Sequence, residues 1–543
     1  MPNSVGHRAL AGWLLVLAAG IWLRFWQLDL QLLIDDEWHA LHRLMNAGYE
    51  RIFLSFGHAD YCIPLTLLFR FLAETVGLTE WRLRALPMAA GLATLMVVPV
   101  LLRRWLDAGE RLTLGALIAL SPLLIHFARY VRPYALIVLL GVIAMLVLWR
   151  LWRHGGRGRA LAFFGCAVLA AWLHPLTALY TGAALSWFGI ASLHHWYRHG
   201  SARQLGRVVL LGGATTLACC VLILPPLLTD PHSILVKAGK HSITSGTLAR
   251  SWEMVLGTGS PWVAGLLTVP VLLGAWLLWR RDRLFMLYWL WLTLAAAVAI
   301  GLIGPEWVQN ALVLVRYTAI SVPLVLACLA VGLVALLRAL RARLPLPGIG
   351  ALGGLACLAG LYLAGPLPAT YSGVNSFTNS VRYQVDYDFE RSIFRSVMGD
   401  LAVPEAYRRM AAEPGDWEIV EAAWHFETHH TPISQYQRFH QMPVRIGMIS
   451  GLCTDWTYGE IHPDWSGRIR LDRFVFLSEL LASPSPVDRF VVFHRRLAFD
   501  YSRELPDTGP CVAAFRRHFG APWHEDADQI VFRIPAAGRA GGA

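Results

Sequence analysis

The sequence predicts a mainly α fold: a polytopic transmembrane helical bundle of about eleven spans, followed by an extracytoplasmic soluble α/β domain. Three observations predict it. Hydrophobic residues make up 56% of the 543 residues and charged residues 15%, with a mean hydropathy of +0.48. Runs of roughly 18 or more apolar residues, the length that crosses a bilayer, recur to about residue 368 and then stop. Arginine gathers in every second loop between these runs.

The apolar runs define the predicted spans. They place helices at 8–28, 85–102, 112–128, 133–151, 159–174, 175–194, 207–228, 262–279, 284–304, 312–337 and 348–367. We interpret the first run as a retained helix rather than a cleaved signal peptide, because it is rich in Trp and Leu and lacks a small-residue A-x-A cleavage site.

The arginines orient the bundle, because cytoplasmic loops of membrane proteins collect Lys and Arg. With the N-terminus inside, the basic loops are RRWLDAGER, RLWRHGGRGR, WYRHGSARQLGR, RRDR and RALRAR. The net charge of +11 is then mainly a topology signal, and we expect no nucleic-acid partner. The segment 29–84, the turns near Arg132 and His174, the loop 229–261 and the tail lie outside the cytoplasm.

Two domains follow from the change of pattern near Pro368. Residues 1–368 form the membrane domain, with the first outer loop at 29–84, and residues 369–543 form the soluble tail. In the tail WEIVEAAW, VRIGMI, RFVVFHRR and QIVFRIP are typical of strands, while DFERSIFRSVMGDLA and CVAAFRRHFG are typical of helices. Cys453 and Cys511 are the only cysteines of the tail. An oxidising compartment permits a disulfide between them, but spacing alone leaves their pairing open.

The first outer loop has two predicted helices of its own. Trp38, Leu41 and Met45 follow helical spacing from Asp36 toward Gly48, which predicts an amphipathic helix suited to the membrane surface. PLTLLFRFLAETVG predicts a second one, of about 21 Å, that is too short to cross.

Three carboxylates, Asp35, Asp36 and Glu37, stand directly before the first of these helices in LLIDDEWHA. A carboxylate that is partly desolvated near a membrane gains strength as a base, which suits removing a proton from an incoming hydroxyl group. The structural alternative is that Asp36 caps the helix and Glu37 is a favourable first-turn charge.

A cationic cluster is predicted on the same side of the membrane. In HFARYVRPYAL, Arg129 and Arg132 precede Pro133 and Tyr134 at an outward helix start. Guanidinium groups together with free backbone N–H groups suit a phosphate. In RYTAISVP, Arg316 and Tyr317 lie within a late span, where an arginine needs a partner or a cavity. Arginines that snorkel to water are the alternative in both places.

Weaker candidates lie in the other outer segments. His174 precedes Pro175 at another outward helix start, where a turn residue is the simpler interpretation. His58 and Asp60 in GHADYCIPL either line the same cavity or make the turn. Lys237 and Lys240, the only lysines, either bind a lipid phosphate or have no special role. HFETHH in the tail (425–430) has ligand-type residues without the spacing of a metal site.

Taken in order, these features resemble the GT-C superfamily of membrane glycosyltransferases, in its protein O-mannosyltransferase and aminoarabinose lipid A transferase branch. The resemblance is carried by the acids after the first helix, the PL-containing short helix of the same loop, RPYAL opening the fourth span, RYT and a following proline in a late span, and the outward α/β tail. It covers roughly residues 8–340, and CIPL departs from it where relatives often have a charged residue and paired prolines.

The resemblance implies a function. A bacterial, multi-pass inner-membrane enzyme would transfer a monosaccharide, a hexose or a pentose, from a polyprenyl-phosphate carrier to an acceptor that approaches from outside. Asp36 maps onto the base of the family. Oligosaccharyltransferase relatives hold a divalent ion with acids from two outer loops, whereas HFARYVRP has no carboxylate. We therefore expect an inverting, metal-independent reaction without a cofactor.

Two rival classes stay open at this point. A transporter or flippase of a lipid-linked sugar would spread its polar residues through the membrane midplane, often in broken helices, whereas the candidates here gather at the outer boundary. The second rival is a non-catalytic envelope assembly protein with a binding tail, and only a measurement of enzymatic activity distinguishes it from a glycosyltransferase.

Overall fold

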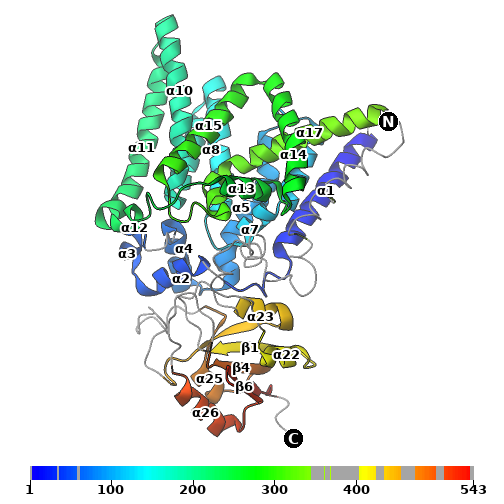
Figure 1. Ribbon diagram of the computed structural model, residues 1–543. Helices are drawn as coiled ribbons and strands as arrows, with labels where there is room; N and C mark the ends of the chain where they lie inside the picture. Colours follow the sequence, from blue (N-terminus) through cyan, green and yellow to red (C-terminus); the bar gives the residue numbers. More distant parts are fainter. Residues whose placement is uncertain are drawn as a thin grey trace. The chain divides into compact units, whose positions relative to one another are not determined.

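The computed structural model describes residues 3–33, 36–57, 62–343, 360, 367, 403–422, 433–453, 471–496 and 507–537. The chain forms two compact units (Figure 1). Unit 1 comprises Met1–Phe25, Phe53–Leu65 and Ala85–Pro368, and unit 2 comprises Trp26–Ile52, Thr66–Arg84 and Ala369–Ala543.

Unit 1 is a bundle of long apolar helices. Its elements are α1 (Asn3–Phe25), most of α5 (Glu80–Leu101), α6 (Ala108–Leu120), α7 (Pro122–Arg129), α8 (Tyr134–His154), α9 (Arg157–Leu173), η1 (Pro175–Thr177), α10 (Ala178–His199), α11 (Arg203–Thr229), α12 (His232–Leu235), α13 (Ser245–Leu256), α14 (Pro261–Arg281), α15 (Arg283–Ile303), α16 (Ala311–Thr318), η2 (Ala319–Ser321) and α17 (Val322–Arg343).

Within the described residues, seven helices are long and apolar enough to cross a membrane, or eight if a bent pair counts as one span. The polytopic fold class is therefore confirmed, and the protein is a multi-pass membrane protein. The predicted count of eleven is not confirmed. The predicted span 159–174 is the 17-residue helix α9, the first span ends at Phe25 rather than at residue 28, and all but residues 360 and 367 of the span 348–367 lie outside the described part of the chain.

The predicted span 112–128 is not one helix. α6 and α7 meet at an angle of 56°, because Ser121 has an extended backbone and its side chain accepts a hydrogen bond from the backbone N–H of Leu124 at 3.4 Å. Pro122 occupies the first position of α7, where its missing N–H costs nothing. Hydropathy continues through this break, but capping chemistry starts a new helix there.

Two glycines let α14 and α17 approach closely. A Cβ atom on Gly274 would lie 1.8 Å from the carbonyl oxygen of Cys328, and one on Gly332 would lie 1.8 Å from that of Pro270. Small residues of this kind let helix backbones pack tightly within membranes. The pair therefore fixes one helix–helix contact of the bundle by shape.

Unit 2 joins parts of the first outer loop to the tail. From the loop come α2 (Glu37–Asn46), nearly all of α3 (Tyr49–Phe53), most of α4 (Ile63–Thr75) and the first turn of α5; from the tail come α22 (Glu405–Ala411), β1 (Trp417–Ala422), α23 (Ile433–His440), β2 (Val444–Met448), β3 (Phe474–Phe476), α25 (Leu477–Ala482), β4 (Asp488–His494), α26 (Gly509–Phe519), β5 (His524–Glu525) and β6 (Gln529–Ile534).

The tail is a six-stranded sheet in the order β3-β2-β1-β4-β6-β5. Strands β1 to β4 pair in parallel, and β6 pairs antiparallel with β4 and β5. All four predicted strands are present, and CVAAFRRHFG lies in α26. The predicted helix DFERSIFRSVMGDLA (388–402) lies outside the described residues. The short elements α22, α23, α25, β3 and β5 were not predicted.

Cys453 and Cys511 form a disulfide, with their Cα atoms 4.9 Å apart. Cys453 follows β2, and Cys511 lies in the first turn of α26, so the bond ties together parts of the tail that are 58 residues apart. A structural disulfide persists in an oxidising compartment.

Candidate active site

Asp36 occupies the N-cap position of α2, but its side chain makes no capping hydrogen bond. Its backbone is helical (φ −53°, ψ −17°) rather than extended, which differs from the usual geometry of a capping residue. The side chain is 22% exposed, and one carboxylate oxygen lies 3.7 Å from Nδ1 of His39. A role as a helix cap therefore does not by itself explain why an acid stands at this position.

The two neighbouring acids differ in placement. Glu37, the first residue of α2, is completely buried. A buried carboxylate is costly unless other groups stabilise it. Asp35 lies outside the described residues.

Helix α2 has the amphipathic pattern that the sequence predicts. Trp38, Leu41 and Met45 are buried at 1%, 0% and 0% exposure, and Nε1 of Trp38 donates to the carbonyl oxygen of Leu33 at 2.8 Å. Together these contacts fix the start of the helix next to Asp36.

The other end of α2 is held by Arg70 from α4. Its Nη1 donates to the carbonyl oxygens of Leu44 at 2.7 Å and of Ala47 at 3.2 Å, while its Nε donates to Glu74 at 2.5 Å. Burial alone would raise the pKa of Glu74, but hydrogen bonds from Tyr49 and Arg70 outweigh it and hold that pKa below its usual range. Glu74 therefore stays ionised and keeps Arg70 aimed at the helix end.

In unit 1 the predicted cations Arg132 and Arg316 meet at one aromatic ring. The guanidinium carbon of Arg132 lies 5.9 Å from the centroid of Tyr134, and that of Arg316 lies 5.1 Å from the same centroid. Arg316 is also 5.8 Å from the ring of Tyr130. Both arginines are more than nine-tenths buried, at 5% and 8% exposure. Residues separated by more than 180 positions thus form one cationic cluster.

The local fold explains this meeting. Arg132 lies in the short connection between α7 and α8, and Pro133 is the N-cap of α8, although the sequence predicts it in the first turn. Arg316 lies in α16, which ends at Thr318 before the 3-10 turn η2. Each arginine therefore lies close to an interruption of regular helix.

Arg129 ends α7 and is completely buried. Its Nη1 donates to the carbonyl oxygen of Leu23 at 3.3 Å, so part of this guanidinium holds α1.

His126, one turn before Arg129, is a further member of the cluster that was not predicted from the sequence. It is 1% exposed, and its ring stacks on that of Tyr130 with the centroids 4.8 Å apart. The sequence spacing could have indicated this contact, because residues four positions apart lie about one helical turn from each other.

His174 and Tyr317 extend the aromatic cluster. The ring of His174 lies 6.5 Å from that of Tyr134 and 5.5 Å from that of Tyr317. His174 ends α9, as the turn interpretation expects. The structure therefore gathers Arg132, Tyr134, His174, Arg316 and Tyr317.

The remaining candidates are placed elsewhere. His58 and Asp60 lie outside the described residues. Lys237 is half-buried and Lys240 exposed, in a segment whose backbone bonds with 303–306: Lys240 N donates to Gly304 at 3.0 Å, and Lys237 accepts from Glu306 N at 2.8 Å.

Within the described ranges, no three His, Cys, Asp or Glu side chains are grouped so that they could hold a metal ion. The HFETHH segment lies outside those ranges. Metal independence stays a prediction.

No protein-family model matches the chain, and no curated protein matches it either. Among solved structures, the chain is similar to ArnT from Cupriavidus metallidurans in the apo state, with 13% identity, a TM-score of 0.45, and coverage of 98% of this chain and 100% of that one. ArnT bound to undecaprenyl phosphate gives 13% identity, a TM-score of 0.42, and coverage of 98% and 99%. The archaeal oligosaccharyltransferase AglB from Archaeoglobus fulgidus, in complex with an inhibitory peptide and a dolichol-phosphate, gives 12% identity, a TM-score of 0.42, and coverage of 90% of this chain and 69% of that one.

The roles of individual residues are therefore argued from the side chains of this chain.

Proposed function

We propose that this protein is a membrane glycosyltransferase that moves a monosaccharide, a hexose or a pentose, from a polyprenyl-phosphate carrier to an acceptor on the outer side of a bacterial inner membrane. The nature of the donor comes from the family resemblance of the sequence. The role of Asp36 as the base comes from the same resemblance, and the geometry described above supports the role proposed for the arginines.

The observation that carries the proposal is the convergence of Arg132 and Arg316 on Tyr134. The two guanidinium groups bring several N–H donors together beside one ring. Guanidinium groups present planar pairs of donors that match phosphate oxygens. A lipid phosphate that gains charge as the sugar leaves would be stabilised by about 3 to 4 kcal/mol per well-placed donor.

Asp36 is the proposed base. It is a partly exposed acid without a capping bond, and His39 lies 3.7 Å away. In the proposed step the acceptor hydroxyl oxygen attacks the anomeric carbon and inverts it, and the bond from that carbon to the phosphate oxygen breaks. The acceptor proton passes to Asp36, and the polyprenyl phosphate leaves as an anion held by the arginines. Atoms and charges balance without a metal ion or a cofactor.

The proposed sidedness agrees with the disulfide. Cys453 and Cys511 are bonded in the tail, and such bonds form and persist outside the cytoplasm. The arginine-rich loops support a cytoplasmic N-terminus. Both arguments support the proposal that the tail lies outside the cytoplasm.

The test uses the purified full-length protein in nanodiscs with a panel of polyprenyl-phosphate monosaccharides and a membrane extract as acceptor. Release of free polyprenyl phosphate is followed with and without a chelator. The proposal expects release from one donor class that survives chelation. No release from any donor, together with movement of the lipid-linked sugar across a vesicle bilayer, would indicate a flippase instead.

A further inference from the structure

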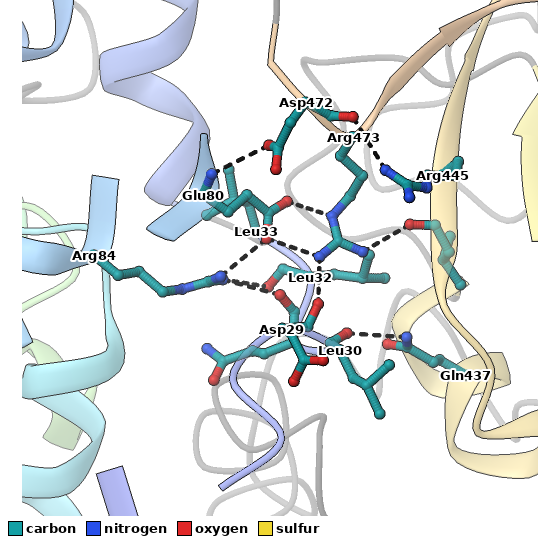
Figure 2. Close-up of polar contacts among 12 residues, drawn as sticks. Asp29, Leu30, Leu32, Leu33, Glu80, Arg84, Gln437, Arg445, Asp472 and Arg473 are labelled. Carbon is teal, nitrogen blue, oxygen red and sulfur yellow. Dashed lines mark hydrogen bonds and ion pairs between the residues drawn. The ribbon is translucent and has the colours of Figure 1, made fainter. Parts of the chain in front are cut away.

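The segment Asp29–Leu33, which leads from α1 toward Asp36, has an irregular backbone whose carbonyl groups are bound by side chains. Its residues Gln31, Leu32 and Leu33 are buried at 1%, 3% and 1% exposure. A buried carbonyl group needs a donor, and regular secondary structure supplies none here. Five successive carbonyl oxygens accept such bonds. Asp29 accepts from Arg473 Nη2 at 2.8 Å, Leu30 from Gln437 Nε2 at 3.0 Å, and Gln31 and Leu32 from Arg84 Nη2 at 3.0 and 3.4 Å (Figure 2). The fifth, Leu33, accepts from Trp38 Nε1 at 2.8 Å.

Two of these donors come from the tail, and we call the contacts of Arg473 and Gln437 with Asp29 and Leu30 the tail clamp. Arg473 directly precedes β3, and Gln437 lies in α23. Gln437 is completely buried and also donates to the carbonyl oxygen of Met442 at 3.1 Å. All of these residues belong to unit 2.

A buried carboxylate fixes Arg473 in place. Nε of Arg473 donates to Oε1 of Glu80 at 2.5 Å and its Nη2 to Oε2 at 2.9 Å, while Nη1 of Arg84 donates to the same Oε2 at 2.9 Å (Figure 2). The remaining nitrogen of Arg473, Nη1, donates to the carbonyl oxygen of Val444 at the start of β2, at 2.7 Å. One guanidinium therefore connects the tail sheet, the first turn of α5 and the segment before Asp36.

A stacking contact adds a second link at the far end of the segment. The ring of Trp38 lies parallel to that of Phe474, with an interplanar angle of 7° and centroids 6.4 Å apart. Trp38 is two residues after Asp36, and Phe474 is the neighbour of Arg473. The tail thus contacts the chain on both sides of the acid.

We propose that the tail is a positioning element for the reaction, in which Arg473 and Gln437 hold Asp29–Leu33 so that Asp36 and the start of α2 are fixed in their working place. This inference rests on the proposed function. It assigns the tail a task that needs no ligand of its own, and it makes Arg473 and Gln437 positioning residues that act through Asp36.

The test compares two clamp variants with a matched control in the full-length protein. Gln437→Met removes the donor to Leu30 at nearly constant volume, and Arg473→Lys keeps the charge but loses the forked geometry. Arg489→Met is the control, because Arg489 pairs with Glu418 inside the tail sheet and its side chain is 13% exposed, against 9% for Arg473. Arg473→Gln, which removes the charge, completes the series.

Two readouts are measured on each variant: hydrogen exchange of peptides covering 28–40 and of the sheet, and kcat and KM for polyprenyl phosphate release. We expect Gln437→Met and Arg473→Gln to raise exchange in 28–40 at least tenfold and to lower kcat at least tenfold, with KM for the donor within twofold. Arg473→Lys should recover part of kcat, and Arg489→Met should stay within threefold in kcat with unchanged exchange in 28–40.

The outcomes separate the inference from the proposed function. Unchanged exchange in 28–40 for both clamp variants would overturn the clamp itself, whether or not the protein is active. Faster exchange with unchanged kcat, or an equal loss of kcat in Arg489→Met, would overturn the positioning role. A wild-type protein that releases no polyprenyl phosphate would refute the proposed function, and with it the role of the clamp in catalysis, while the exchange data would still report on the clamp.

Discussion

Replacing Glu80 by alanine tests the energetics of unit 2 most severely. Glu80 is 4% exposed, and its carboxylate accepts three hydrogen bonds from the guanidinium groups of Arg84 and Arg473, which are 1% and 8% exposed. Without it two buried cations lose the carboxylate that they share. Removing one side of a buried ion pair typically costs about 3 to 5 kcal/mol, because the remaining charge stays desolvated.

That cost has a measurable consequence. A loss of about 3 to 5 kcal/mol corresponds to a fall of roughly a hundredfold to several thousandfold in the hydrogen-exchange protection of the amides that open with the network. We expect this fall in α2 and β2 of the Glu80→Ala protein in nanodiscs. In the double variant Glu80→Ala with Arg473→Met, one stranded charge is gone, so the loss should be at least about 1 kcal/mol smaller than the sum of the two single losses.

The control is the exposed pair of Glu413 and Arg533 in the same unit, whose atoms lie 3.1 Å apart at 26% and 41% exposure. Glu413→Ala should change protection by no more than about 1 kcal/mol, as solvent-exposed pairs do. Less than tenfold loss of protection in Glu80→Ala, or strict additivity in the double variant, would refute the reasoning.

Four further predictions follow from single features. Burial lowers the pKa of His440 to about 3, so between that pH and about pH 6.5 the unfolded chain binds a proton that the folded chain does not. The wild type should therefore lose about 2 kcal/mol of folding free energy between pH 7 and pH 5, measured by melting curves, and His440→Gln should lose less. Equal losses in the two proteins would contradict the assignment. Arg316→Ala should lower kcat for polyprenyl phosphate release by roughly 10²-fold or more, with Arg316→Lys intermediate; a variant of wild-type rate would remove Arg316 from the site. Reduction of the Cys453–Cys511 bond should destabilise the tail by about 2 to 5 kcal/mol, seen as faster proteolysis of the tail, and unchanged proteolysis would argue against it. Gly332→Ala should cost about 1 to 3 kcal/mol by forcing α14 and α17 apart, which detergent melting curves would detect; an unchanged melting temperature would show that the helices adjust without cost.

The sequence predicts those parts of the fold that depend on local composition. α8, α14 and α15 follow from long apolar runs, and β1, β2, β4 and β6 from short β-branched and aromatic runs. The span 112–128 was wrong as one helix because hydropathy does not register the cap that Ser121 and Pro122 provide. α22 and α23 were missed because they are short and polar, and packing rather than periodicity holds them in place.

The candidate site was predictable to a similar extent. Chemistry and order along the chain singled out Arg132, Tyr134 and Arg316, which the structure brings together. One partner of Glu80, Arg473, is 393 residues away in the sequence, and nothing in the local pattern of either residue indicates the other. Long-range pairing of this kind depends on the tertiary fold, so the tail clamp could be found only in the structure.

The most direct test of the central claim is the single-turnover rate of polyprenyl phosphate release by Asp36→Asn, compared with the wild type at a saturating concentration of the donor that the panel identifies. Donor binding is measured on the same samples. We predict a rate loss of about 10²- to 10⁴-fold, the usual contribution of a general base, with donor affinity unchanged because Arg132 and Arg316 are intact. An Asp36→Asn protein that binds donor and releases polyprenyl phosphate at the wild-type rate would contradict it.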